Sequence, residues 1–278
     1  MQIQEYSDLK SCSSPGDLLG YLGQLVHSPS GLSQFGSFTA SVYDSAWLSM
    51  VSRRQDSQLQ YLFPGCFEYV LSQQQDDGCW PGYASSIDGI TNTAAGLLAL
   101  LARKSHVSKL EHDGNLSQRI TQAISGLNGL LQKWDVSKGD QVGFEIIIPS
   151  LLEQIGKFDI KFEFPGQSQL EKLNMQKLGK FRPEFLYTTH QTTILHSLEA
   201  LVGLVDFDRI SHHCTAEYGI LGSPAATAAY LIHSSNWDSR AEEYLQRVVS
   251  LAKDENGGVP SGFPTPNFEL SWVGSAPS

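Results

Sequence analysis

His196 is the residue whose type and surroundings best suit acid–base chemistry. It lies in the stretch 192–205, where apolar residues recur at helical spacing and form one face: Ile194, Leu195, Leu198, Leu201, Val202 and Val205. His196 falls on the opposite side of this predicted helix, and Glu199 at i+3 could hold its ring and raise its pKa. Such a histidine is a candidate general base toward a cavity. The alternative, a solvent-facing histidine on an outer helix, is the commoner situation.

Acidic and polar residues suggest two further sites, and both favour a structural interpretation. Asp76 and Asp77 could bind a metal or act as acid and base, but they directly precede Gly78, where aspartate is common for reasons of turn geometry. Three residues resemble a set of helix side chains that binds a metal ion and a diphosphate: Asn236, Ser239 and Glu243. Each of the last two lies one position too early for that spacing, so a helix cap and a solvent-exposed face are the expected roles.

The sequence predicts no metal or cofactor site in this chain. The histidines are dispersed, and His212–His213 has no third ligand nearby in sequence for zinc. Signatures of a nucleophile elbow, a phosphate-binding glycine loop or a dinucleotide-binding fold are absent from the sequence. Four cysteines without C-x-x-C spacing indicate free thiols in a reducing compartment: Cys12, Cys66, Cys79 and Cys214.

Composition narrows the class of protein. The 278 residues are 41% hydrophobic, enough to build a core, and the net charge of −10 argues against nucleic acid as a partner. The longest run of apolar or small residues, Ala94–Ala102, is far too short to span a membrane. No basic region followed by an apolar core begins the sequence, so no signal peptide is expected and the predicted location is the cytoplasm.

The elements that must position these residues are helices in a repeated pattern. Phe63–Leu71 has one apolar face, whereas Thr91–Leu101 is apolar or small all round, which is typical of a helix buried on every side. Trp80 lies in the loop between them and is expected to fill the gap. An amphipathic stretch over 183–205 and a buried helix capped by Ser223 repeat the pattern. The repeat predicts an all-α fold, an α/α barrel.

Other segments also show helical patterns. Proline suits the first turn of a helix, so one helix is expected to begin near Pro149. A narrow, aromatic-rich stripe on Ser41–Val51 needs a partner surface. The remaining predicted helices are Asp17–Val26, Asn115–Trp134, Gln167–Lys180 and Asn236–Lys253.

Six strings occur in a fixed order: SVYDSAW (41–47), QQQDDGCWPG (73–82), GFEIIIPSLLE (143–153), TTILHSLEALVGL (192–204), GSPAATAAYL (222–231) and GGVPSGFPTPNFELSW (257–272). Together they resemble the N-terminal part of class II diterpene cyclases of the copalyl diphosphate synthase type. The fungal bifunctional copalyl diphosphate/kaurene synthases are the nearest. The resemblance extends from about residue 15 over nearly the whole chain.

The resemblance implies a division into domains. Such enzymes enclose their active site between two α/α barrels, β and γ, and the γ barrel is inserted after the first β helix. On this mapping, 1–15 is a loose N-terminus and 16–54 holds the N-terminal helices, including the first β helix. Residues 55–255 form the γ-like barrel, and 256–278 begin a truncated return into β.

The resemblance also implies a substrate and two site residues. The family cyclises geranylgeranyl diphosphate, uses Mg²⁺, and protonates the substrate with the middle aspartate of a D-x-D-D string. The nearest string here, Asp206–Arg209, fails at its fourth position. His196 matches the histidine that helps a water remove the final proton in plant members. Ser261 replaces its asparagine partner and lacks the span of an amide, so an altered base is expected.

Three hypotheses follow. The first is a diterpene cyclase-like chain that is inactive alone because it lacks the acid. The second is a truncated paralogue that pairs with itself or another cyclase through an exposed apolar patch: Trp47, Met50, Phe268 and Trp272. The third is an unrelated enzyme on an α/α toroid, such as a sugar-processing enzyme, with a carboxylate pair drawn from Glu145, Asp77 and Asp88.

Overall fold

The computed structural model describes residues 38–265, apart from 56–57, 84, 107–113, 140, 253 and 255, together with Ser14, Gly16, Asp17 and Gly20. Its α-helices are α3 (Val42–Met50), α4 (Pro64–Gln73), α5 (Ser86–His106), α6 (Gly114–Lys133), α7 (Phe144–Gly156), α8 (Gln167–Leu178), α9 (Pro224–His233) and α10 (Ser239–Arg247). Shorter helical segments are η2 (Val136–Lys138), η3 (Pro183–Tyr187), η4 (Thr193–Leu201), η5 (Phe207–His213) and the π-helical η6 (Val248–Ala252). Most of the helix predicted over Asp17–Val26 lies outside the described residues.

The all-α class is confirmed, although the described residues also contain three short antiparallel strand pairs that were not predicted. β1 (Ala40–Ser41) pairs with β6 (Val259–Pro260), β2 (Ser52–Gln55) with β3 (Gln58–Tyr61), and β4 (Cys214–Thr215) with β5 (Gly219–Ile220). Pair β1–β6 joins the residues just before α3 to a segment more than two hundred positions later. These strands are two to four residues long and lie in the connections between helices, so the helices still form the barrel.

Trp80 fills the gap between α4 and α5, as predicted. Its side chain is 1% exposed, and its Nε1 donates a hydrogen bond of 2.7 Å to the carbonyl of Val70 on α4. A methyl group placed on Gly96 of α5 would lie 2.9 Å from the indole ring, so only glycine lets the two approach. One aromatic side chain and one glycine therefore allow the close packing of this helix–loop–helix repeat.

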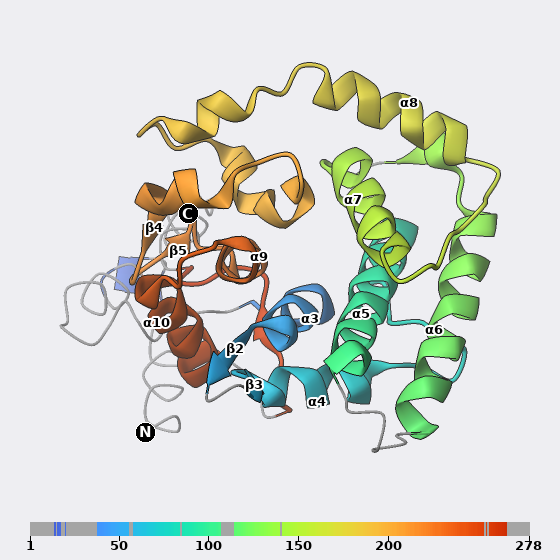
Figure 1. Ribbon diagram of the computed structural model, residues 1–278, viewed down its shortest axis with the longest axis horizontal. Coiled ribbons are helices and arrows are strands. Elements are labelled where there is room, and N and C mark those ends of the chain that lie inside the picture. Colours follow the sequence, from blue (N-terminus) through green and yellow to red (C-terminus); the bar gives the residue numbers. More distant parts are fainter. Residues whose placement is uncertain are drawn as a thin grey trace.

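The helix α3 lies at the centre of the molecule, between α9 on one side and α4 and α5 on the other (Figure 1). The aromatic-rich stripe has the partner surface that was predicted, because α3 packs against all three helices. Most of its other side chains are buried as well. Trp47 is 1% exposed. The exposed patch predicted from Trp47 is therefore wrong at that residue. Met50 is half-buried, and Phe268 and Trp272 lie outside the described residues.

Helix α7 begins five residues before the position predicted from its proline. Gly143, with φ of +96°, is the residue before its first turn, and Pro149 lies inside the helix. An internal proline frees the carbonyl four residues earlier, here that of Glu145. The side-chain amide of Asn174 on α8 donates a 2.8 Å hydrogen bond to this carbonyl. The neighbouring helix thus satisfies the group that the proline leaves unpaired.

Candidate functional site

His196 lies on η4, which is a 3₁₀ segment and not the α-helix that was predicted. Ser197 interrupts it with non-helical angles of φ −121° and ψ 40°. The fully buried residues are Leu195, Leu198 and Leu201, spaced by three positions, which matches the three residues per turn of a 3₁₀ helix. The apolar residues seen in the sequence fit both periods, and packing against α7 and α9 selects the tighter one.

Glu199 does not raise the pKa of His196, contrary to the prediction from spacing. The imidazole is exposed at one edge of η4, and partial desolvation by the surrounding atoms lowers its pKa. Glu199 instead is 3% exposed, and the hydroxyl of Tyr43 on α3 donates a hydrogen bond of 3.1 Å to its Oε1. The neutral imidazole at pH 7 is the form that can accept a proton.

The first turn of α3 bonds to three distant segments. Besides the bond from Tyr43 to Glu199, the backbone N–H of Ala225 on α9 donates to Asp44 Oδ1 at 3.2 Å. The backbone N–H of Val259 on β6 donates to Ser45 Oγ at 3.0 Å. This turn therefore holds η4, α9 and β6 against one another.

Asp44 also bonds to Ser41, the residue that caps the N-terminus of α3. Ser41 Oγ donates to Asp44 Oδ2 at 2.7 Å, and the N–H of Asp44 donates back to Ser41 Oγ. Burial raises the pKa of Asp44 to about 6, although these bonds and that from Ala225 oppose the shift. Asp44 is mostly ionised at pH 7 and faces the positive end of α9.

Ser261 follows β6 directly and is exposed. The pairing of β6 with β1 places this segment at the start of α3, the helix that also contacts η4 through Tyr43. Within the described ranges, no hydrogen bond joins Ser261 to His196. The structure thus brings both predicted site residues onto segments bonded to the same helical turn, without a direct bond between their side chains.

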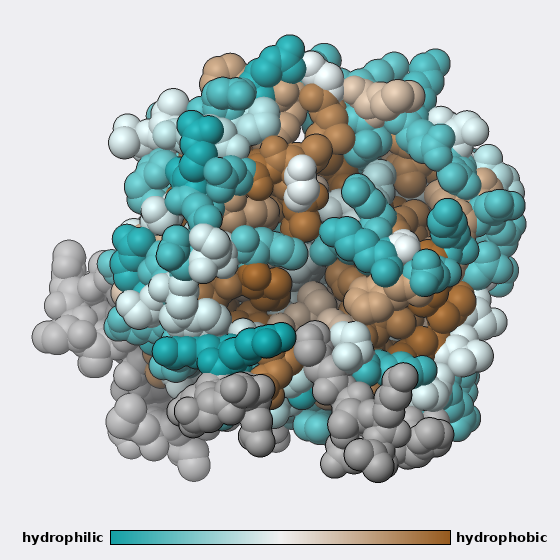
Figure 2. Space-filling model, viewed as in Figure 1, coloured by the Kyte–Doolittle hydropathy of each residue, from teal (hydrophilic) through white to brown (hydrophobic). Residues whose placement is uncertain are grey.

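A groove of about 400 Å³ opens between η2, α7 and α8. Glu145, Lys177 and Lys180 contribute its charges, and Lys177 Nζ lies 2.7 Å from Glu145 Oε1. Desolvation acts to raise the pKa of Glu145, but the bonds from Lys177 and from the Gly143 N–H outweigh it and lower the pKa. On the face of the molecule that Figure 2 draws, hydrophobic side chains gather in hollows between hydrophilic ridges. Sequence reasoning missed the groove, because its residues come from three separate elements.

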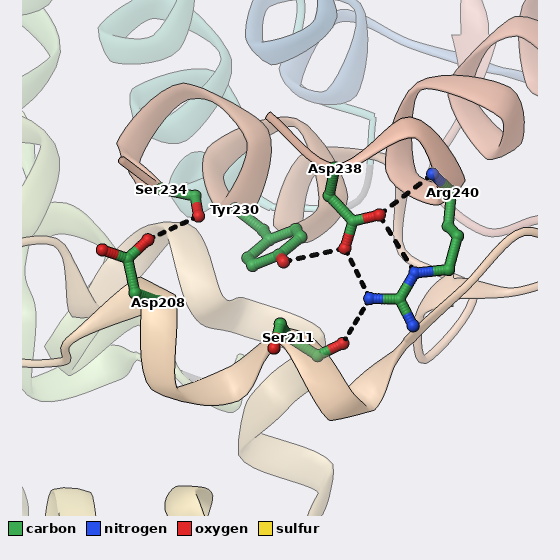
Figure 3. A network of polar contacts seen from close by, with 6 residues as sticks. All are labelled: Asp208, Ser211, Tyr230, Ser234, Asp238 and Arg240. Carbon is green, nitrogen blue, oxygen red and sulfur yellow. Dashed lines mark hydrogen bonds and ion pairs between the residues drawn. The ribbon is translucent and has the colours of Figure 1, made fainter. Parts of the chain in front are cut away.

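The string nearest to a D-x-D-D acid is structural (Figure 3). Asp206 caps η5 by accepting from the N–H of Asp208. Asp208 in turn accepts hydrogen bonds from Ser235 and Ser234, and these lower its pKa. A carboxylate with a lowered pKa is ionised at pH 7 and carries no proton, so it cannot act as the acid that protonates the substrate. The same view shows Asp238, the cap of α10, held by Tyr230 and Arg240.

The other candidates from the sequence are also structural. Asp77 Oδ1 accepts from the N–H of Cys79 in a turn that contains Gly78 at φ +84°. The carboxylates named for a sugar-processing enzyme have separate partners: Asp77 as above, Glu145 with Lys177, and Asp88 with Gln141 and Ser85. His212 and His213 each bond a backbone carbonyl, Thr188 and Leu186 respectively.

No metal site is formed in the part of the chain that the structure describes, where no three His, Cys, Asp or Glu side chains meet as ligands. Cys79 and Cys214 are buried free thiols, as predicted, and Cys66 is also buried. No helix in the described ranges is long and apolar enough to cross a bilayer.

The helical barrel and the order of the motifs define a chain of the terpene cyclase class, and comparison with known proteins agrees. The chain is 43% identical over 267 residues to pimaradiene synthase of Emericella nidulans, covering 95% of this chain and 27% of that protein. It is 41% identical over 263 residues to copalyl diphosphate synthase of Talaromyces verruculosus, covering 93% and 27%. The crystal structure of ent-copalyl diphosphate synthase from Arabidopsis thaliana superposes with a TM-score of 0.69 at 25% identity, covering 93% of this chain and 35% of that one.

The homologues of this chain are fungal diterpene synthases, as its motifs predicted. It spans about a quarter of the length of the curated relatives that it matches. A scan against models of protein families finds no match.

Proposed function

We propose that this chain supplies one wall of a class II diterpene cyclase site, for a prenyl diphosphate of the geranylgeranyl type. The similarity to fungal diterpene synthases over 95% of the chain carries the proposal. In this assignment residues 55–255 are the γ-like barrel, and the short segment around α3 is the first β helix. The parent reaction is cyclisation begun by protonation of an alkene, and the cytoplasm stays the predicted location.

The groove between η2, α7 and α8 supports a diphosphate-bearing substrate. Lys180 brings a cationic ammonium group to a groove of about 400 Å³, where the ammonium of Lys177 is paired with Glu145. Lysine binds phosphate oxygens as a compact point charge. Apolar lining from Val136, Phe144 and Leu173 suits the neighbouring hydrocarbon.

His196 and Ser261 are proposed as the base side of the reaction. A neutral imidazole with a pKa lowered by desolvation can take a proton through a water. Ser261 can accept and donate one hydrogen bond to such a water. With a hydroxyl in place of an amide, the water is held less firmly, and we expect the product to differ from that of the plant-type base.

These 278 residues alone are not expected to make a cyclised diphosphate. They contain no D-x-D-D string, and the nearest one serves as a helix cap. Loss of a positioned acid costs about 10²–10⁴-fold in rate. The test is incubation with geranylgeranyl diphosphate and Mg²⁺, then dephosphorylation and mass spectrometry. We expect geranylgeraniol only, whereas a bicyclic diterpene alcohol would overturn the proposal.

A non-catalytic partner role is the second candidate, and its support is narrower than the sequence implied. Trp47 is buried, so a pairing surface would have to rest on Met50, Phe268 and Trp272. Size-exclusion chromatography tests it: a dimer would favour pairing, and a monomer with low dye binding would argue against it.

A further inference from the structure

The position of His196 depends on how η4 is anchored, because η4 has weak hydrogen bonding of its own. A 3₁₀ segment of nine residues is long for its kind. The break at Ser197 directly follows His196 and separates the two halves. Leu195 anchors the first half by burial. The second half, beyond the break, carries Glu199, whose side chain forms the one side-chain hydrogen bond between η4 and α3 among the described residues.

The bond between Tyr43 and Glu199 spans 156 positions of the chain and is partly buried. Glu199 is 3% exposed, and its second oxygen, Oε2, is buried without a hydrogen-bond partner. No lysine, arginine or histidine forms an ion pair with it in the described ranges, and α7 and α9 give it no hydrogen bond. The titratable groups that face it are Tyr43 and Asp44, both on α3.

These surroundings favour the neutral acid. An ionised carboxylate with one unpaired buried oxygen and no counter-ion would be far costlier than a neutral one. The negative charge of Asp44, which is itself held by Ser41 and the N-terminus of α9, adds to this cost. Burial accordingly raises the pKa of Glu199 to about 8, with a further contribution from Asp44.

We propose that Glu199, as a neutral carboxylic acid bonded to Tyr43, is a positioning residue that fixes the His196 segment against α3. Glu199 then acts on the reaction only through the place and solvation of the imidazole. The inference rests on the proposed function for the catalytic role of His196. The bond itself can be tested without any activity.

The test is a titration of the histidine imidazoles by NMR in the 278-residue protein, with His196 assigned from the signal lost in H196N. Y43F and E199A remove the bond, so the pKa of His196 should rise toward 6.5 as the segment loosens and hydration increases. E199Q keeps an acceptor oxygen for the Tyr43 hydroxyl and should leave the pKa of His196 near its wild-type value. The matched control is Y230F, which removes another partly buried tyrosine–carboxylate bond, that to Asp238, and should leave the pKa of His196 unchanged.

Two results would overturn the proposal. One is that Y43F leaves the His196 titration unchanged, which would mean that the bond does not position the segment. The other is that E199Q raises the pKa of His196 as E199A does, which would mean that an acceptor oxygen for the Tyr43 hydroxyl is not what holds the segment. The ¹³C shift of the Glu199 carboxyl gives a second readout, and it should report a protonated acid at pH 7. Cyclisation assays do not enter these measurements, so failure of the positioning role is distinguished from failure of the proposed function.

Discussion

Replacing Glu199 by glutamine should change how the stability of the protein depends on pH. Burial raises the pKa of this carboxyl from its usual value near 4.5 to about 8 in the folded state. Between these values the folded protein holds a proton that the unfolded chain releases. The free energy of unfolding contributed by Glu199 is therefore fully present below the lower value and is lost as pH rises through the upper one. Glutamine cannot ionise, so E199Q should not show this loss of unfolding free energy as pH rises.

The magnitude follows from the separation of the two values. A tenfold change in proton affinity corresponds to about 1.4 kcal/mol, so the whole window represents roughly 5 kcal/mol. Between about pH 5.5 and pH 8, the wild type should lose about 3 kcal/mol relative to E199Q. Other groups titrate as well, in the variant and in the wild type alike. The difference between variant and wild type cancels these common contributions.

Urea unfolding at the two pH values measures the effect. The control is E153Q, at an exposed position of α7, which should differ from the wild type by the same amount at both pH values. A difference between E199Q and wild type that is equal at both pH values would mean that Glu199 is already ionised in the fold. The reasoning on its burial would then be refuted.

Two further predictions concern the fold. G96A should lower the unfolding free energy by about 1–3 kcal/mol, because the new methyl group would meet the Trp80 ring at 2.9 Å; G129A, with open space at its Cβ, should be neutral or stabilising in the same thermal melts. S223A should lose the cap bond from the N–H of Ala226 and cost about 1 kcal/mol in urea unfolding. An unchanged melting temperature for G96A, or an unchanged urea midpoint for S223A, would contradict them.

The parts of the fold that could be predicted from the sequence rest on local patterns. Trp80 stands between a one-sided helix and an all-apolar one, and Ser223 precedes a proline and a run of small residues. The structure contains both predicted features: Trp80 bonds to α4 next to α5, and Ser223 caps α9. Asp76 and Asp77 directly precede a glycine, so the prediction of a turn needed no knowledge of the rest of the chain.

The parts that could not be predicted depend on distant residues. Pro149 is tolerated inside α7 because Asn174, 29 positions later, bonds the carbonyl that it frees. Leu195, Leu198 and Leu201 fit a 3₁₀ period as well as an α-helical one, and only the packing decides. Glu199 was paired with His196 by sequence spacing, but Tyr43 reaches it from α3.

The burial of α3 changes how mutations near the candidate site must be interpreted. Its first turn bonds to η4, α9 and β6, so loosening it lowers the stability of the barrel and displaces the base segments together. A loss of activity in a full-length relative, after an alanine change in this turn, would not separate the two effects. Variants that conserve shape do separate them, because Y43F and E199Q each change one hydrogen-bonding property while keeping most of the packing. The informative comparison is therefore between these two, with stability measured alongside the histidine titration.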